Sequence, residues 1–75
     1  MIYSTHLLRQ LRRTIGQNIR AVRTKQKMTL RYLSRKSGVP EYLIDQYELG
    51  KNEISLEEML RVACVLGMEV SAILL

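Results

Sequence analysis

The side chains best suited to binding another molecule are the basic ones, and they are unevenly distributed along the 75 residues. Residues 1–36 carry ten of the 12 Lys and Arg residues and no Asp or Glu, whereas residues 37–75 carry the other two and all seven acids. The halves therefore have formal charges of +10 and −5, which give the net +5. A basic half without one acid predicts a polyanionic partner. The alternative is a solvated face whose charges serve only solubility.

A second set of candidate binding groups lies on a short helix predicted to follow Gly38. Apolar residues at helical spacing predict its buried side, which consists of Val39, Leu43, Ile44 and Tyr47. The outer side then carries Glu41, Tyr42, Asp45, Gln46 and Leu49, most of which can form hydrogen bonds. We expect this helix to end at Gly50 as its C-cap.

The preceding segment predicts the helix that would position these side chains. Thr29 is a good N-cap, and the apolar positions after it predict a helix through Lys36. Gly38 can adopt the left-handed backbone that ends a helix, and Pro40 fits the first turn of the next one. Two short helices joined by a tight turn match the helix-turn-helix pattern, whose second helix usually lies in the major groove of DNA.

The rest of the chain is predicted to support this pair of helices. A stripe of apolar residues predicts a helix over residues 5–26, which residues 14–16 could interrupt: Leu8, Leu11, Ile15, Ile19 and Val22. Ser55 and Glu58 have the spacing of a capping box, and we expect a helix from there to Gly67. Its predicted buried face consists of Leu56, Met59, Leu60, Ala63, Cys64 and Leu66. Residues 69–75 predict a further short helix, and its last three residues, Ile73, Leu74 and Leu75, either enter the core or contact a second subunit.

Composition excludes several classes of protein. A single cysteine, Cys64, excludes an internal disulfide and a cysteine-based zinc site, and we expect it to be a buried apolar side chain. His6 has no other metal-binding residue at ligand spacing, so no metal site is expected. There is no nucleophile–base pair, no apolar run long enough to span a bilayer and no signal peptide. We therefore expect a cytoplasmic protein that is not an enzyme, with a basic extension at 1–13 and one domain at 14–75.

With these elements placed, the chain resembles the Cro/CI-type helix-turn-helix family, also called the XRE family. The resemblance covers residues 15–74 and is carried by IGQNIRAVR, MTLRYLSRKSGV, LIDQYELGK, ISLEEMLRVACVLGM and VSAILL. It implies an all-α, lambda-repressor-like bundle of five helices, here with an N-terminal helical extension. It also implies a repressor that binds operator DNA as a homodimer, without a cofactor or a small-molecule ligand.

The resemblance assigns roles to individual residues. Arg23 and Glu48 match the family's ion pair between the first and third helices. The predicted phosphate contacts are Thr29, Arg31, Lys51 and Asn52. The predicted base-reading positions are Pro40, Glu41, Tyr42, Asp45 and Gln46. The predicted dimer surface is the C-terminal region that contains Ile73, Leu74 and Leu75.

Three departures from the family pattern bear on this interpretation. Leu30 stands where the family commonly has Gln, and Tyr32 replaces the acid that would complete a capping box with Thr29. The proposed reading helix is acidic and has no Lys or Arg. Carboxylates can accept hydrogen bonds from cytosine N4 and Gln46 can pair with adenine, so base reading remains possible. The alternative is a protein-interaction module on the same fold that has lost specific DNA reading.

Overall fold

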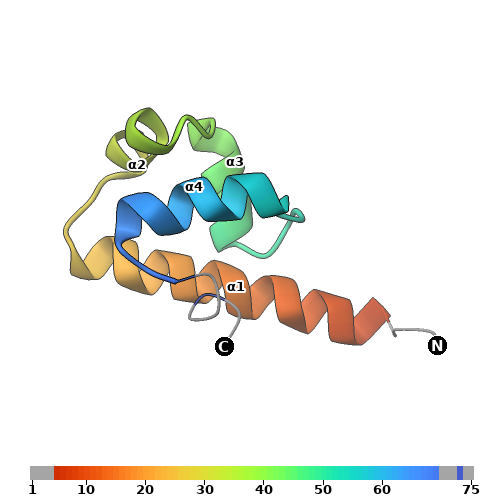
Figure 1. Ribbon diagram of the computed structural model, residues 1–75. Coiled ribbons are helices and arrows are strands. Elements are labelled where there is room, and N and C mark those ends of the chain that lie inside the picture. The colour runs from red at the N-terminus through yellow and green to blue at the C-terminus, as the bar shows by residue number, and fades with distance from the viewer. Residues whose placement is uncertain (1–4, 70–72, 74–75) are drawn as a thin grey trace.

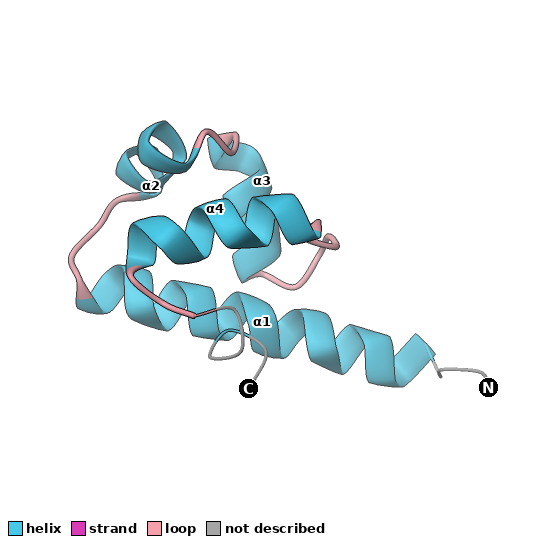
Figure 2. Ribbon diagram, viewed as in Figure 1, coloured by secondary structure: helices cyan, strands magenta, loops and turns pink. Residues whose placement is uncertain are grey.

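The computed structural model describes residues 5–69 and 73, and these form α-helices without a strand. The helices formed by the described residues are α1 (Thr5–Lys25), α2 (Leu30–Ser37), α3 (Glu41–Glu48) and α4 (Leu56–Leu66), and Figures 1 and 2 show how they are arranged. α1 packs against α3, and α2 packs against both α3 and α4. The all-α prediction is confirmed, but a bundle of five helices is not. Most of the segment predicted to form the fifth helix lies outside the described residues.

Local capping signals determine where α2 and α4 begin and end. The Thr29 hydroxyl accepts a hydrogen bond from the backbone N–H of Tyr32 at 3.0 Å, and Gly38 ends α2 with a left-handed φ of 76°. Ser55 and Glu58 form the predicted capping box at the start of α4, and Gly67 ends that helix. These caps satisfy backbone groups that helix ends otherwise leave unpaired.

The predicted limits of α3 were each wrong by one residue. Pro40 is the N-cap rather than part of the first turn, and its carbonyl accepts hydrogen bonds from the N–H groups of Leu43 and Ile44. Leu49 is the C-cap, and Gly50 follows it with a φ of 72°. The N–H groups of Gly50 and Lys51 bond to the carbonyls of Tyr47 and Gln46, which is a Schellman ending. In this motif the residue with the left-handed conformation, Gly50, comes directly after the C-cap residue, Leu49.

The core lies between the four helices. Its buried apolar residues come from every helix, from the turn between α2 and α3 and from Ile73 after α4: Ile15, Ile19, Leu33, Val39, Ile44, Tyr47, Met59, Val62, Ala63, Leu66 and Ile73. Ile73 was expected at the predicted dimer surface, but its side chain is fully buried in its own chain, and its carbonyl accepts a hydrogen bond from Asn18 Nδ2 at 2.7 Å. Leu74 and Leu75 lie outside the described residues.

The prediction for α4 was partly wrong, because Leu56 and Leu60 are 67% and 52% exposed and Cys64 is also exposed. Val62 is buried in their place. Apolar residues surround much of α4, so periodicity alone could not identify the stripe that faces the core.

α1 is continuous through residues 14–16, where the sequence left a break open. Gly16 lies at the crossing of α1 and α3, and a Cβ atom there would be 2.0 Å from the carbonyl oxygen of Tyr47. No side chain fits in this space. The glycine therefore does not interrupt α1 but allows α3 to approach it closely.

α1 ends at an unusual backbone conformation. Lys27 has a φ of 59°, and it is the one residue other than glycine with a positive φ in the described part of the chain. The N–H groups of Lys27 and Met28 bond to the carbonyls of Thr24 and Arg23, so Lys27 occupies the position that glycine usually takes in such an ending. Among the described residues, no helix is both long and apolar enough to cross a membrane.

Candidate nucleic-acid interface

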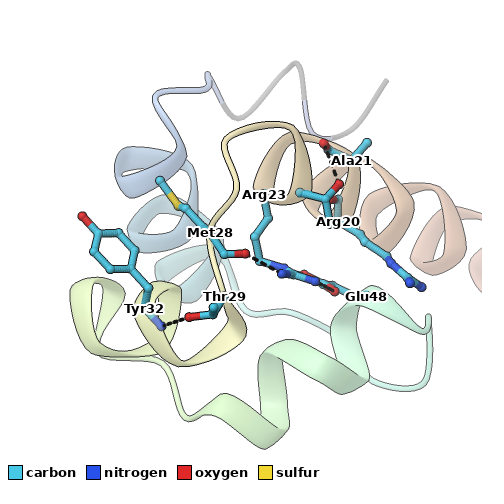
Figure 3. Close-up of polar contacts among 8 residues, drawn as sticks. Arg20, Ala21, Arg23, Met28, Thr29, Tyr32 and Glu48 are labelled. Carbon is cyan, nitrogen blue, oxygen red and sulfur yellow. Dashed lines mark hydrogen bonds and ion pairs between the residues drawn. The ribbon is translucent and has the colours of Figure 1, made fainter.

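The ion pair between Arg23 and Glu48 joins α1 to the end of α3 (Figure 3). The Arg23 Nε donates to Glu48 Oε2 at 2.6 Å, and Nη2 donates to Oε1 at 2.9 Å. Nη1 donates to the carbonyl of Met28 at 2.7 Å, just before α2. The hydrogen bond to Glu48 raises the pKa of Arg23 above its ordinary value. One guanidinium therefore fixes both helices of the pair relative to α1.

The arrangement leaves the outer face of α3 open. Glu41, Tyr42 and Asp45 are exposed, Tyr42 by 66% of its surface, and together with Leu30 of α2 they line a shallow depression. Pro40 is exposed at the start of the helix, and Gln46 is half-buried. The five predicted base-reading residues therefore lie at the start and along the accessible part of one short helix.

A hydrogen bond between side chains connects α3 to the loop that follows it. Asn52 Nδ2 donates to Gln46 Oε1, so a predicted phosphate-contacting residue touches a predicted base-reading one. This contact uses the Gln46 amide oxygen, so the two N–H donors of that amide remain available for other hydrogen bonds. Sequence reasoning missed the contact because nothing in the spacing of the two residues indicates that the loop folds back.

The predicted phosphate contacts lie around α2 and after α3. Arg31, Lys51 and Asn52 are exposed, and the hydroxyl of Thr29 caps α2. Tyr32 was considered only as a departure from the family, but its side chain is 47% exposed, and the Lys36 Nζ lies 5.6 Å from its ring centroid. Such a pair presents a cation and a hydroxyl on the same face of α2.

The acidic residues of α3 differ in their surroundings. Glu48 is buried and paired with Arg23, and its side chain is only 4% exposed. Glu41 and Asp45 take part in no ion pair with any described residue, although Asp45 lies close enough to help raise the pKa of Arg23. Two unneutralised carboxylates therefore remain on the face that the helix pair presents.

A second polar contact, which sequence reasoning also missed, joins α3 to α4. The Tyr47 hydroxyl donates to Glu58 Oε1 at 2.6 Å, which ties α3 to the capping box of α4. This hydrogen bond holds the pKa of Glu58 below its ordinary value, and the bonds from Ser55 add to the effect. Burial, more than the bond to Glu58, raises the pKa of Tyr47. α3 is thus held to α1 by the buried Arg23–Glu48 ion pair and to α4 by the hydrogen bond of Tyr47.

Residues 19–73 match the model of the helix-turn-helix family, and this range includes α2, α3, α4 and the Arg23–Glu48 pair. The chain belongs to the XRE-type helix-turn-helix family. No curated protein sequence matches it closely enough to count as a relative. The regulators of this family are typically not enzymes. Within the described residues, no group of three or more His, Cys, Asp or Glu residues could hold a metal ion.

Several solved structures share this fold. The restriction-modification controller protein C.AhdI from Aeromonas hydrophila has a TM-score of 0.80 and 26% identity over 83% of this chain and 94% of its own. The clp gene regulator ClgR from Corynebacterium glutamicum has a TM-score of 0.81 and 33% identity over 85% of this chain and 68% of its own. The DNA-binding domain of BldD, at 24% identity, shows the fold alone, with a TM-score of 0.77 over 88% of this chain and 96% of its own. The family and the first two structures support a DNA-binding transcriptional regulator.

Proposed function

We propose that this XRE-type protein is a sequence-specific repressor that binds DNA as a homodimer, with α3 in the major groove. The observation that carries the proposal is the fixed position of α3. Arg23 bonds to Glu48 and to the carbonyl of Met28, so the helix pair cannot rotate against α1 without breaking charge-assisted hydrogen bonds. A reading helix needs such a fixed angle, because base edges are recognised by directional hydrogen bonds.

Affinity and specificity would come from different residues. Thr29 and Arg31 lie at the start of α2, and Lys51 and Asn52 follow α3. In this proposal these four residues contact phosphates, and the remaining basic residues of α1 and α2 add a salt-dependent attraction. Discrimination would come from Pro40, Glu41, Tyr42, Asp45 and Gln46. In this arrangement the carboxylates of Glu41 and Asp45 accept hydrogen bonds from the amino groups of cytosine or adenine. Their negative charge disfavours any docking position on the DNA that places them near a phosphate.

The similar structures support the same reading of the fold. C.AhdI is described as a controller protein and ClgR as a gene regulator. Both align with this chain over more than four-fifths of its length. The shared arrangement of helices supports a regulatory role for this chain. Its acidic α3 supports a preference for DNA bases that differs from that of the two similar proteins.

A second candidate function is a protein-interaction module, and the charge on α3 favours it. Glu41 and Asp45 are exposed and form no ion pair with a described residue, as expected of a surface that binds a basic protein segment. In that case DNA would be repelled by this face. Glu41→Ala and Asp45→Ala would then strengthen nonspecific DNA binding without changing any preferred sequence.

Repeated selection from a randomised duplex pool, at several salt concentrations, tests the proposal. The proposal predicts enrichment of a two-fold-symmetric site whose half-sites lie about one helical turn apart. It also predicts that Glu41→Ala changes the enriched bases, whereas Lys51→Ala weakens binding to all sequences alike. Salt-sensitive binding without an enriched site, or no binding at all, would contradict the proposal and favour the interaction module.

A further inference from the structure

The first half of α1 carries a small recess formed by its own side chains. The recess is lined by His6, Arg9, Gln10 and Arg13, all of them exposed, and it has a volume of about 160 Å³. These positions are spaced by three and four residues, so they follow one side of the helix for two turns, about 10 Å along its axis. In Figure 1 this part of α1 extends past the other helices. The recess is therefore accessible to a large partner.

Every side chain that lines the recess can donate hydrogen bonds. Each guanidinium carries five N–H donors and no acceptor, the amide of Gln10 carries two donors, and the imidazole of His6 carries at least one. A site of this composition favours an anion. Arginine in particular pairs with the oxygens of carboxylates and phosphates through two parallel hydrogen bonds.

The positive charge of the recess is not neutralised within the described chain. Arg9 and Arg13 form no ion pair with a described residue. Arg12, between them in sequence, does not line the recess and bonds to Glu53 at 2.6 Å. Residues 1–36 contain no Asp or Glu that could serve instead. Two arginines of this surface therefore remain available to an external anion.

The recess begins beside the loop that follows α3. The turn at Gly50 rests on α1 at Arg13, since a Cβ atom on Gly50 would be 3.1 Å from the Arg13 Cα. Lys51, the next residue, is exposed and is one of the phosphate contacts in the proposed function. From Arg13 the recess runs toward the start of α1, away from this loop. A duplex presents a row of phosphates, about 3.4 Å apart along the axis on each strand, so an elongated site beside Lys51 fits a DNA strand better than a single small anion.

We propose that the α1 recess binds backbone phosphates of DNA next to those that Lys51 contacts. Arg9 and Arg13 donate to the phosphate oxygens, and His6 and Gln10 add further N–H donors. The recess increases affinity without reading sequence, because phosphate contacts carry no base information. This inference rests on the proposed function, in which α3 positions the duplex. It extends that function to a part of α1 that precedes residues 19–73, the range that matches the family model.

The salt dependence of DNA binding tests the proposal. The binding constant of the full chain is measured at several salt concentrations, with a selected duplex and a scrambled duplex, for the wild type, Arg13→Gln and Arg9→Gln/Arg13→Gln. Each phosphate contact contributes about 0.9 to the slope of log K against log salt. We expect the slope to become shallower by about 1 in the single variant and by about 2 in the double variant. The bases enriched by selection should not change, because α3 is unaltered.

Arg12→Gln is the matched control. It removes the same charge from the same helix, but at a side chain that bonds to Glu53 and lies outside the recess. We expect it to change the slope by less than half as much as Arg13→Gln, because it acts only through the screened net charge. Circular dichroism checks that each variant is folded. If Arg13→Gln does not fold, Arg9→Gln takes its place, with the same expected change in slope.

Equal slopes for Arg12→Gln and the recess variants would overturn the proposal, since the recess arginines would then contribute only net charge. Failure of the proposed function is detected separately, in the enriched bases. A shallower slope in the recess variants on both duplexes, with no enriched site, supports the phosphate recess and refutes base reading by α3. An enriched site with an unchanged slope in these variants supports base reading and overturns the recess. A wild type that binds no DNA overturns both.

Discussion

The guanidinium of Arg23 and the carboxylate of Glu48 form a two-point contact although 25 residues separate them in the chain. Their side chains are only 12% and 4% exposed, so water contributes little to their solvation. The same guanidinium also holds the carbonyl of Met28. The angle of α3 therefore depends on one arginine at the end of α1.

Breaking this pair should destabilise the protein strongly. Arg23→Met leaves the carboxylate of Glu48 buried without a cation, and we expect a loss of about 3–5 kcal/mol in the free energy of unfolding. The double variant Arg23→Met/Glu48→Leu should be more stable than Arg23→Met, since no charge is then stranded. Urea denaturation of both variants measures this difference. An Arg23→Met variant as stable as the wild type would show that the pair does not hold α3.

Gly16→Ala should destabilise the protein although alanine is the better helix former. The new Cβ would be 2.0 Å from the carbonyl oxygen of Tyr47, so α1 and α3 would have to separate. We expect a loss of about 3 kcal/mol, at the upper end of the usual effects of overpacking. Gln17→Ala, at the next and exposed position of α1, is the control and should change stability by less than about 0.5 kcal/mol. Thermal unfolding of the two variants compares them, and equal melting temperatures would contradict the close approach.

Lys27→Gly should stabilise the fold. Lys27 has a φ of 59°, a conformation that is unfavourable for a residue with a Cβ. Glycine removes this strain but has a more flexible unfolded state, and we expect a net gain of about 0.5–1 kcal/mol in the free energy of unfolding. Lys25→Gly, within the last turn of α1, should instead be destabilising by about 1 kcal/mol. Chemical denaturation distinguishes the two, and a loss of stability in Lys27→Gly would refute the assignment of strain.

The contact between Tyr47 and Glu58 should make stability depend on acid pH. The folded protein holds the pKa of Glu58 below its ordinary 4.5, chiefly through the Tyr47 hydroxyl, so the folded state binds a proton less readily than the unfolded chain. The resulting stabilisation is complete above pH 4.5 and is lost as the pH falls through the lower, folded pKa. We expect the wild type to lose more stability than Glu58→Gln in urea titrations carried below that pH. Glu57→Gln, which alters an exposed neighbour, should follow the wild type. Parallel curves for the wild type and Glu58→Gln would exclude this contribution.

Asn52 should influence which base Gln46 recognises, if α3 reads DNA as proposed. Asn52 donates to Gln46 Oε1, which leaves the Gln46 amide to donate toward the acceptors of guanine. In Asn52→Asp the new carboxylate can only accept, so the Gln46 amide would turn and present its oxygen to the amino group of adenine. We expect the enriched base to change from guanine to adenine in selections with this variant. Asn52→Ala should accept both bases, and an unchanged preference in both variants would show that Asn52 does not orient Gln46.

The parts of the fold that were predicted correctly depend on neighbours in the chain. Thr29, Gly38 and Ser55 act on backbone groups within four residues, and their capping roles were predicted from short patterns. The parts that were missed depend on distant elements. The spacing of Leu56, Leu60 and Cys64 is as helical as that of the buried stripe, and only the packing of the rest of the chain against α4 determines which stripe is covered. The role of Gly16 is likewise defined by a carbonyl on another helix.

The candidate site divides in the same way. The exposed face of α3 follows from periodicity, so Glu41, Tyr42 and Asp45 were located from the sequence. The contacts of Gln46 with Asn52 and of Tyr47 with Glu58 depend on how the loop after α3 folds back. No short-range pattern indicates them. The resemblance to the family suggested the Arg23–Glu48 pair, but the third bond of Arg23, to Met28, was evident only in the structure.

The most direct test of the central claim is to map the DNA-contacting surface by amide chemical shifts. A selected duplex would be titrated into isotopically labelled protein, with a scrambled duplex of equal length and charge as the control. We predict that the selected duplex shifts the amides of Thr29, residues 41–46, Lys51 and Asn52, and that the scrambled duplex affects α3 much less. Shifts confined to residues 5–13 or to α4, with none in α3, would contradict the claim that α3 reads DNA.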